Sequence, residues 1–461
     1  MAASASTSLE PFGASLRQKY WRFEDGWNNL NHGSYGAAPA PVLDALAALR
    51  AQSERAPDRF MKTEYQPLLD ALRARLASFV DCDTGDLVMV GNATMGINAV
   101  LRSLTTEWKE GDKLLYLSST IYPACATTLQ YIIDTHPHLS LSLLPVHVTY
   151  PLSHDALVSA VRAAIERAES APGAGKVRLA LVDAISSMPG VRVPWERLVE
   201  LFRENGVLSL IDAAHQIGQL PVSLRTSRPD FWVSNCHKWL LAARSSAVLY
   251  VDKQHQHLMH SLPTAYLYRS PSFPTSSPTD WTSEFSWTGT VDWAPILSTA
   301  AALDFRETVL GGENRIREYC HALAKEGGEV VARVLGTEVM RNEREEDGEL
   351  IANMVTVRLP LPPPSSLLPP CSSSGPTQSI LQSGPLSSFW ARTLLSEHKT
   401  HAFLFVHGDA FWVRLSATVY LEVEDFRRGA EAIGAVCEAI RRGEHERVEE
   451  AKEEVKAAEE A

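Results

Sequence analysis

Two spacings of apolar residues alternate along most of the chain. Short apolar runs, such as residues 177–182 and 208–211, end in polar or small residues. Between them lie segments with helical spacing, for example residues 42–54, where Val42, Leu46 and Leu49 share one face. Continuous apolar runs are typical of strands that are buried on both faces, as in parallel sheets. The pattern therefore predicts an α/β protein with a mostly parallel sheet.

The order of these segments predicts two domains of unequal size. The expected strands are residues 87–90, 113–117, 140–145, 177–182, 208–211, 231–233, 247–250, 351–359, 403–406 and 411–417. The expected helices are residues 42–54, 68–79, 94–101, 123–133, 155–168, 195–204, 294–308, 312–335 and 425–441. Strand and helix alternate up to about residue 250, which predicts a large domain over 31–293 and a smaller α+β domain over 294–443.

Four further segments stand apart from this pattern. Residues 1–30 form an N-terminal arm, and residues 265–286 are expected to be a loop rich in serine, proline and threonine. Residues 360–388 are dominated by proline, serine and leucine, and we expect a surface insertion without regular elements. Glutamate and lysine dominate residues 444–461, which we expect to be a solvated tail.

Composition narrows the class of protein. The 461 residues are 45% hydrophobic and carry a formal net charge of −12, which disfavours nucleic acid and anionic membranes as partners. No run approaches the roughly 20 apolar residues of a membrane span. The six cysteines lack the spacing of a zinc site or a disulfide framework, and the N-terminus lacks a secretory signal pattern. We therefore expect a cytoplasmic protein without a metal.

One lysine interrupts the apolar pattern at a position where it could act as a nucleophile. Lys238 lies between the expected buried strands 231–233 and 247–250. A lysine so placed loses hydration, so its amine can be neutral near physiological pH and attack a carbonyl. The alternative is that the side chain extends its charge to the surface.

Asp212 favours the chemical interpretation of Lys238. Four mostly apolar residues lead into this acid, and small residues follow it, as at the carboxyl end of a parallel strand. Pyridoxal phosphate offers an aldehyde to a lysine and needs a carboxylate at its pyridine nitrogen. Lys238 and Asp212 at successive strand ends supply both, so the sequence predicts this cofactor.

Two strand-to-helix turns are expected to complete the cofactor site. Gly91, Asn92, Ala93 and Thr94 open a helix directly after a strand, and its free backbone N–H groups suit a phosphate. Tyr122 follows the next strand, where ligands bind in open α/β sheets. It is placed to lie against the cofactor ring or to donate a proton to a leaving group, and a core tyrosine is the alternative.

Five segments resemble a known family. Residues 29–36, 91–96, 186–191, 235–240 and 411–416 are similar to class V aminotransferase-fold enzymes. Within that class the similarity is greatest to the isopenicillin N epimerase-like branch, which includes the fungal hercynylcysteine sulfoxide lyases of ergothioneine biosynthesis. The resemblance implies pyridoxal phosphate, fold type I, and an N-terminal arm that packs on the smaller domain.

The resemblance also implies roles for individual residues. His237, and less strongly Asn235, is expected on the phosphate side, while Ser187 and His215 are expected near the ring. Local turn bonds are the alternative for Ser187 and His215. Three residues are expected at the substrate. Arg414 is expected as a clamp for the α-carboxylate, and an exposed sheet-face residue is the alternative. His32 and Ser34, with Tyr35, lie in a nearby loop, where local turn bonds are the alternative. Thr290 is expected to reach the phosphate of a neighbouring subunit, which implies a homodimer with shared active sites.

The expected reaction is elimination from an amino acid. Lys238 takes the Cα proton, Asp212 keeps the ring protonated, and Tyr122 helps a sulfur leaving group depart. The resemblance implies hercynylcysteine sulfoxide as substrate, with pyruvate and ammonia as products. Alternatives are an epimerase of the isopenicillin N type, a cysteine desulfurase using the poorly activated Cys371, an aminotransferase, and a scaffold that has lost catalysis.

Overall fold

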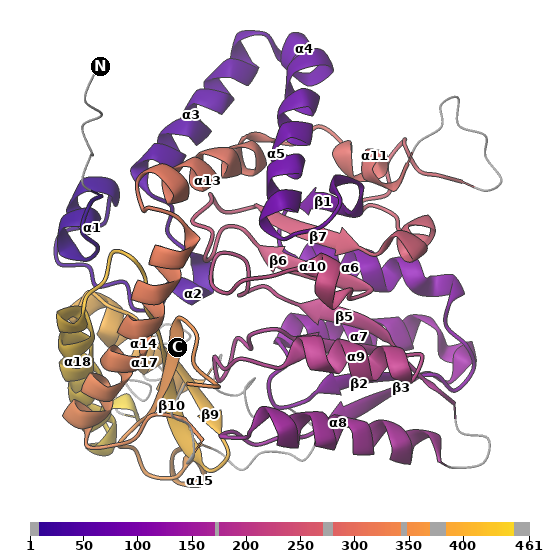
Figure 1. Cartoon of the computed structure of the whole chain (residues 1–461). Helices are drawn as coiled ribbons and strands as arrows, with labels where there is room; N and C mark the ends of the chain where they lie inside the picture. The colour runs from indigo at the N-terminus through magenta and orange to yellow at the C-terminus, as the bar shows by residue number, and fades with distance from the viewer. Residues whose placement is uncertain (1–8, 171–174, 271–279, 343–347, 369–383, 447–461) are drawn as a thin grey trace, which may run out of the picture.

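The computed structural model describes residues 9–170, 175–270, 280–342, 348–368 and 384–446. Most of the expected tail, the middle of the expected insertion and Cys371 lie outside these ranges. The chain forms a large domain around one sheet and a smaller domain beside it, with helices α3 and α5 extending from the large domain (Figure 1).

The large domain is built on a seven-stranded sheet with the order β1-β7-β6-β5-β4-β2-β3. Its strands are β1 (Leu87–Val90), β2 (Lys113–Leu117), β3 (Ser142–Val146), β4 (Val177–Asp183), β5 (Leu208–Asp212), β6 (Phe231–Asn235) and β7 (Ala247–Val251). All neighbours from β6 to β3 pair in parallel, and only β7 runs against its neighbours. The predicted mostly parallel sheet is confirmed.

Both faces of this sheet are buried, as the apolar runs predict. Successive residues of β6 alternate between two core clusters, with Trp232 in one and Phe231 and Val233 in the other. One face packs on α3 (Ala40–Arg55), α5 (Tyr65–Phe79), α8 (His154–Glu169), α9 (Trp195–Glu204), α10 (Leu224–Ser227), α12 (Ala294–Leu297) and α13 (Thr299–Thr308). The other packs on α6 (Ala93–Ser103), α7 (Pro123–Thr135) and α11 (Trp281–Ser286).

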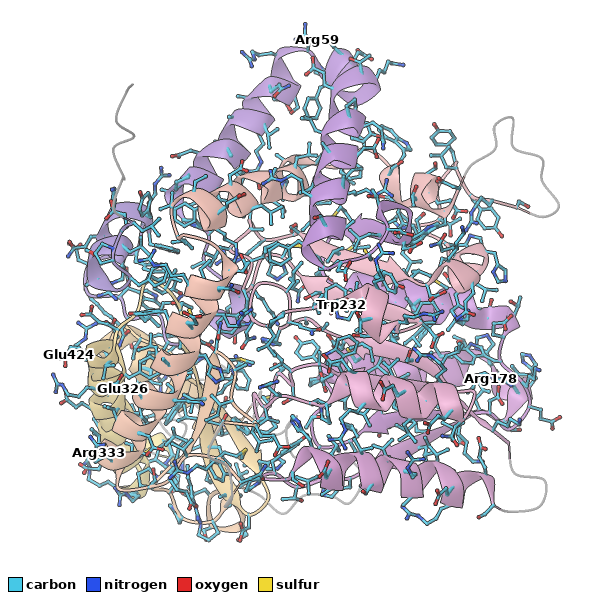
Figure 2. All side chains as sticks on the ribbon, in the orientation of Figure 1. Arg59, Arg178, Trp232, Glu326, Arg333 and Glu424 are labelled. Atoms are coloured by element: carbon cyan, nitrogen blue, oxygen red, sulfur yellow. The ribbon has the colours of Figure 1, made fainter. Side chains whose placement is uncertain are left out.

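Figure 2 contrasts this core with the surface. Trp232 lies in the interior of the large domain, whereas Arg59 and Glu424 lie at the periphery. Arg59 ends the short helix α4 (Pro57–Arg59), at the tip of the projection formed by α3 and α5. No helix of the described residues is long and apolar enough to cross a membrane.

The smaller domain has a three-stranded antiparallel sheet of order β8-β10-β9. Its strands are β8 (Met354–Arg358), β9 (Phe403–His407) and β10 (Ala410–Ser416), and its helices are α14 (Glu313–Leu335), α15 (Pro364–Leu367), α17 (Pro385–Glu397) and α18 (Val423–Arg441). Residues Phe411, Val413 and Leu415 of β10 enter the core of this domain. Because strand side chains alternate, Arg414 faces the opposite way, toward the large domain.

The N-terminal arm contains helix α1 (Ala14–Tyr20), and it contacts the smaller domain. Leu16 and Trp21 belong to the same core cluster as Tyr420. The Arg17 guanidinium donates to Asp425 Oδ2 at 2.8 Å. These contacts are of the kind that the resemblance implies.

Several boundaries differ from the sequence-based expectations. The expected helix 294–308 is divided at Ser298, whose hydroxyl donates to the carbonyl of Pro295 at 2.9 Å, a local bond that competes with helix geometry. The expected loop 265–286 ends in α11, which begins where the Asp280 carboxylate accepts from the backbone of Ser283. The turn at residues 31–36 contains the short helix α2 (His32–Tyr35).

The expectation that residues 360–388 lack regular structure was wrong at both ends. Helix α15 lies within this segment and α17 begins in it. Each begins with a proline, which the first turn of a helix tolerates because its N–H would be unpaired there. Leu386 then packs into the core of the smaller domain, so burial stabilises α17 despite the biased composition.

Candidate active site

A cavity of about 460 Å³ lies at the carboxyl ends of the parallel strands. Ligands bind at this edge in open α/β sheets, because the loops that follow the strands converge there. Residues from seven separate chain segments line the cavity: Ser34, Tyr35, Asn92, Ala93, Thr94, Tyr122, Asp183, Ser187, Met188, Asp212, Ala214, His215, Asn235, His237, Lys238 and Phe403. Most of the predicted site residues therefore share one cavity.

Lys238 lies in the turn that follows β6, and its amine is buried in the cavity wall. Burial, together with the nearby Arg414 charge, lowers the pKa of this amine to about 7. The Lys238 Nζ lies 2.9 Å from His215 Nε2. A lysine amine with these properties is neutral in a large fraction of molecules at pH 7, as nucleophilic attack on an aldehyde requires.

Two carboxyl groups lie side by side at the strand ends. Asp212 ends β5 and pairs in register with Asp183, which ends β4. Asp212 accepts from the backbone N–H of Ala214 at 3.0 Å and from the Cys125 thiol at 3.3 Å. Burial raises the pKa of Asp183 well above its usual range, and the neighbouring Asp212 charge adds to the effect. Burial raises the pKa of Asp212 as well, but not as far, so Asp212 is the member of the pair that ionises more readily. It is also the residue predicted to face a ring nitrogen.

The start of α6 forms another part of the wall. Asn92 caps this helix, since its side chain accepts from the backbone N–H of Met95 at 2.9 Å. The Asn235 side chain accepts from the backbone N–H of Ala93 at 2.9 Å and so joins the end of β6 to the start of α6. Ala93 and Thr94 remain in the cavity wall, where the positive end of the helix suits a phosphate.

His237 is held beside this helix start. Its Nδ1 lies 3.0 Å from the carbonyl oxygen of Ser246, which can only accept, so Nδ1 carries the proton. Burial lowers the pKa of His237 to about 4. Without a bound anion the ring is therefore neutral at pH 7.

Arg414 is a buried cation with polar neighbours and no carboxylate in contact among the described residues. Its Nη1 donates to the Ser187 carbonyl at 2.5 Å, and its Nη2 donates to Ser34 Oγ at 2.7 Å and Asn31 Oδ1 at 3.0 Å. The Arg414 Nε has no hydrogen-bond partner within the part of the chain that the structure describes. Burial lowers the pKa of Arg414 to about 10, so the guanidinium stays charged at neutral pH.

The guanidinium lies just behind the cavity wall. Ser34, Ser187 and Phe403 line the cavity, and each of them contacts Arg414, which itself is not part of the lining. Buried charges are normally paired, so an unpaired guanidinium at this place is suited to an anionic group of a ligand.

His32, like Arg414, is a predicted substrate residue outside the cavity lining, and it bonds to the lysine turn instead. It is buried and does not belong to the lining. Its Nε2 lies 2.9 Å from the Lys238 carbonyl oxygen and its Nδ1 lies 2.8 Å from the Tyr420 hydroxyl. These two bonds position the lysine turn, so the geometry favours a positioning role for His32 over substrate contact.

Of the two remaining predicted residues, Tyr122 lines the cavity and Thr290 does not. Tyr122 lines the cavity and is 43% exposed, so its hydroxyl is open to a ligand. Thr290 is exposed on a surface loop and does not line this cavity in the single chain.

Sequence reasoning gave no role to four residues of the lining, namely Asp183, Met188, Ala214 and Phe403. Asp183 follows the apolar run 177–182 just as Asp212 follows 208–211, so the same strand-end signal was present. Phe403 carries no such signal, because domain packing alone brings it to the cavity.

These residues fit pyridoxal phosphate. The cavity has a helix start for the phosphate, a lysine amine of lowered pKa for the aldehyde and a carboxylate for the ring nitrogen, all in its wall. The orphaned Nε of Arg414 adds a donor for the carboxylate of an amino acid. Among the described residues, no group of three or more metal-ligating side chains is placed to hold a metal ion.

Comparisons with known proteins agree with this geometry. The aminotransferase class V family matches residues 36–358. The L-cysteine desulfhydrase-like protein lolT1 of Epichloe uncinata is 33% identical, over 93% of this chain and 97% of the relative. The hercynylcysteine sulfoxide lyase of Schizosaccharomyces pombe is 29% identical, over 91% of this chain and 97% of the relative.

Solved structures share the fold. A mutant of C-DES with glycine covalently linked to its PLP cofactor has a TM-score of 0.71 at 16% identity, and the match covers 91% of this chain and 98% of that chain. The predicted fold class, a large mostly parallel domain with a smaller one, is thereby confirmed. The chain belongs to the class V aminotransferase family, and its cofactor is pyridoxal phosphate.

Proposed function

We propose that this protein is a pyridoxal phosphate-dependent carbon–sulfur lyase that acts on an S-substituted cysteine sulfoxide. The proposed substrate is hercynylcysteine sulfoxide, and the proposed products are pyruvate, ammonia and a sulfenate. A two-electron reductant such as a thiol would then convert the sulfenate to ergothioneine. Two relatives support the carbon–sulfur lyase class, since one is named desulfhydrase-like and the other hercynylcysteine sulfoxide lyase.

The observation that carries the proposal is that a lysine amine of lowered pKa and a buried guanidinium without a carboxylate partner among the described residues lie at the same cavity. Lys238 lies in the wall of the cavity, and Arg414 lies behind the same wall. Such a site attracts a carboxylate at one end and offers a base for Cα at the other. An α-amino acid has a carboxylate for the first of these groups and a Cα proton for the second.

Each residue then has a stated task. Bound pyridoxal phosphate supplies an electron sink next to the substrate Cα. Lys238 first holds the cofactor and, once released, takes the Cα proton. Arg414 holds the substrate carboxylate, and Asp212 keeps a proton on the pyridine nitrogen.

Tyr122 is proposed as the acid for the leaving group. When the Cβ–S bond breaks, its electron pair departs with the sulfur as a sulfenate, which a proton from Tyr122 converts to the sulfenic acid. Burial raises the pKa of Tyr122, so its hydroxyl stays protonated at neutral pH and is ready to donate. The remaining three-carbon fragment adds water and leaves as pyruvate and ammonia.

A substrate panel tests the proposal. We expect the purified protein with pyridoxal phosphate to release pyruvate from hercynylcysteine sulfoxide, with a kcat/KM at least about tenfold above that for L-cysteine. Pyruvate and the sulfur product would be measured together by mass spectrometry. Turnover of cysteine alone would replace the proposed substrate by that of a cysteine desulfhydrase, and change of configuration at Cα without pyruvate would indicate an epimerase.

A cysteine desulfurase is disfavoured by the described part of the cavity, whose lining contains no cysteine. Cys125 lies next to it, but burial raises the pKa of this thiol well above its usual range. A thiol that stays protonated is a poor nucleophile toward sulfur.

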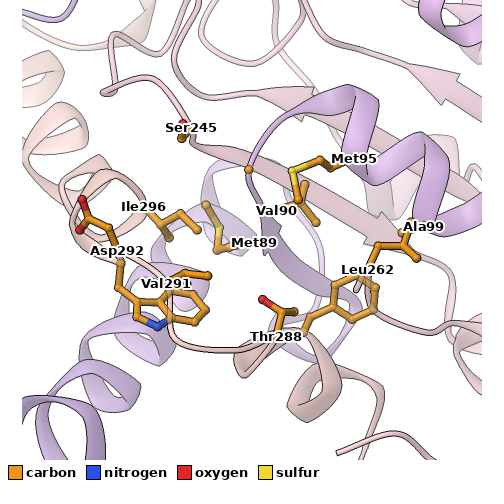
Figure 3. A pocket seen from close by; sticks show the side chains of 13 residues that line it. Met89, Val90, Met95, Ala99, Ser245, Leu262, Thr288, Val291, Asp292 and Ile296 are labelled. Atoms are coloured by element: carbon orange, nitrogen blue, oxygen red, sulfur yellow. The ribbon is translucent and has the colours of Figure 1, made fainter. Parts of the chain in front are cut away.

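We also propose that the enzyme is a homodimer with shared active sites. Beside the turn at Gly91 lies a second, mostly apolar cavity, whose lining includes Met89, Met95, Leu262, Phe285, Val291 and Ile296 (Figure 3). Met95 and Val291 are each more than 40% exposed, and a second copy would cover them. Thr290 is adjacent to Val291, so a copy that covers this surface would bring its own Thr290 close to its partner.

Mixing two variants tests the shared site. Lys238→Ala removes the cofactor lysine, and Thr290→Ala removes the proposed hydroxyl for the phosphate of the partner subunit. We expect Thr290→Ala alone to weaken cofactor affinity about tenfold. Co-expressed with Lys238→Ala, one site of each mixed dimer regains Lys238 together with an intact Thr290. Wild-type cofactor affinity in that fraction supports sharing, whereas a monomer in sedimentation analysis overturns it.

A further inference from the structure

Trp239, the residue directly after Lys238, contacts the histidine that contacts the lysine. Its indole Nε1 lies 3.3 Å from His215 Nδ1, and His215 Nε2 lies 2.9 Å from Lys238 Nζ. His215 and Trp239 are buried, and the Lys238 amine lies in the cavity wall. They form a short chain of hydrogen bonds that ends at the amine that holds the cofactor.

The direction of these bonds follows from the chemistry of the three groups. An indole N–H can only donate, so His215 Nδ1 must accept from it. A neutral imidazole has one N–H, which is then on Nε2. The Nε2–H therefore donates to Lys238 Nζ, and only an unprotonated amine has the lone pair to accept this bond.

We propose that Trp239 is a positioning residue that holds His215 in the tautomer with its proton on Nε2, and thereby keeps the Lys238 amine neutral and ready for the cofactor. The proposal rests on the cofactor of the family and not on the substrate proposed above. It concerns a residue of the lysine turn that is outside the cavity lining.

Without the indole N–H, His215 is free to exchange tautomers. With its proton on Nδ1, the ring would turn an Nε2 lone pair toward the lysine, and a charged –NH₃⁺ would donate to it. That arrangement stabilises the charged amine, so loss of the indole N–H is expected to raise the pKa of Lys238.

Other groups near the amine raise or lower the pKa of Lys238. Besides His215, the groups that act on Lys238 are Arg414, which disfavours its charge, and Asp212, Asp183 and Cys125, which favour it. His215 itself does not compete for a proton, because burial lowers its pKa well below the usual range. None of these groups sets the tautomer of His215, since Trp239 is the one described residue that bonds its Nδ1.

Trp239 is also well anchored apart from this bond. Its carbonyl oxygen accepts from Arg306 Nη1 at 2.7 Å, and its ring packs at 5.2 Å from the His32 ring, centroid to centroid. A phenylalanine at this position keeps the backbone contact and most of the packing. The changes that remain are the loss of one N–H and of part of the ring volume.

The test measures cofactor capture rather than turnover. The full chain is stripped of cofactor, and the rate at which it takes up pyridoxal phosphate is followed by the visible band over pH 5.5–9.5. In the wild type the rate should rise with pH and level off above a midpoint near 7, because the neutral amine is the nucleophile. In Trp239→Phe we expect the midpoint to rise by about one unit, which slows uptake about tenfold below pH 7.

A matched control separates the hydrogen bond from a general disturbance of the core. Trp232→Phe removes another buried indole N–H, which donates to Gln216 Oε1 at 2.8 Å and does not touch His215. We expect its midpoint to equal that of the wild type. If Trp239→Phe fails to fold, benzothienylalanine introduced at position 239 keeps the ring size and removes only the N–H.

The possible results distinguish an effect of the indole N–H from an effect of core packing. A raised midpoint with Trp239→Phe or the benzothienyl variant, and an unchanged one with Trp232→Phe, supports the proposal. An unchanged midpoint in both variants at position 239 overturns it. Equal shifts at positions 232 and 239 also overturn it, since they would assign the effect to core packing.

Discussion

Replacing Lys238 with alanine is expected to abolish pyruvate formation, with a fall in kcat of at least about 10⁴-fold. The same amine holds the cofactor and takes the Cα proton, so its loss removes two steps at once. No other lysine of the described residues lines the cavity, and no neighbour is placed to take over both tasks. The measurement is kcat for pyruvate release, together with the visible absorption of the bound cofactor.

The spectrum makes this expectation specific. Lys238→Ala should still bind pyridoxal phosphate through the start of α6, but the band should lie at the position of the free aldehyde and be insensitive to pH. Lys253→Ala, a change at an exposed lysine beyond β7, is the control and should behave as the wild type. Turnover of Lys238→Ala within tenfold of the wild type would contradict the assignment of this residue as the base.

The sequence revealed those site residues whose burial and position can be inferred from their neighbours in the chain. Lys238 interrupts an apolar region, and Asp212 ends a buried strand, so burial and position along the strand could both be inferred from neighbours in the chain. The same signal at Asp183 was not followed, because it becomes meaningful only when β4 and β5 pair and bring two carboxyls together. Strand order depends on contacts between distant segments, which local pattern does not specify.

Other features needed the tertiary structure altogether. The sequence places His32 and Ser34 two residues apart in one turn, yet Ser34 faces Arg414 while His32 bonds to the Lys238 carbonyl. Both residues lie in the short helix α2, where side chains two positions apart point in different directions, and the sequence predicted only a turn there. Likewise, the tautomer of His215 follows from three side chains in space, of which only Lys238 and Trp239 are neighbours in the chain.

For Arg414, the sequence pattern and the tertiary structure each supply part of the answer. Its alternation with Val413 and Leu415 predicts a strand with one apolar face, but leaves open whether the arginine meets solvent. The structure shows that its face of β10 is turned to the large domain, where the guanidinium is buried. A solvated role is thereby excluded, and the carboxylate clamp gains weight.

Replacing Arg414 with lysine is expected to lower kcat/KM by about 10²-fold, which corresponds to about 3 kcal/mol. Ser34, Asn31 and the Ser187 carbonyl orient the guanidinium through two of its nitrogens, and lysine cannot reproduce that planar fork. The loss should appear mainly in KM if the clamp serves binding alone, and in kcat as well if it also aligns Cα with Lys238. Arg358→Lys, on the neighbouring strand β8 with an exposed Glu338 partner, is the matched control.

A substrate analogue without the carboxylate makes the test of Arg414 decisive. The analogue that lacks only the carboxylate of the cysteine half retains the amine and the sulfoxide but offers no carboxylate next to Cα for the guanidinium to bind. Its affinity for the enzyme, measured from changes in the cofactor band, should be the same in the wild type and in Arg414→Lys. If the substitution weakens the analogue and the full substrate by the same factor, Arg414 acts by supporting the loop of Ser34 and Ser187, and the clamp is wrong. If only the full substrate is affected, the unpaired charge behind the cavity wall is the group that selects an α-amino acid.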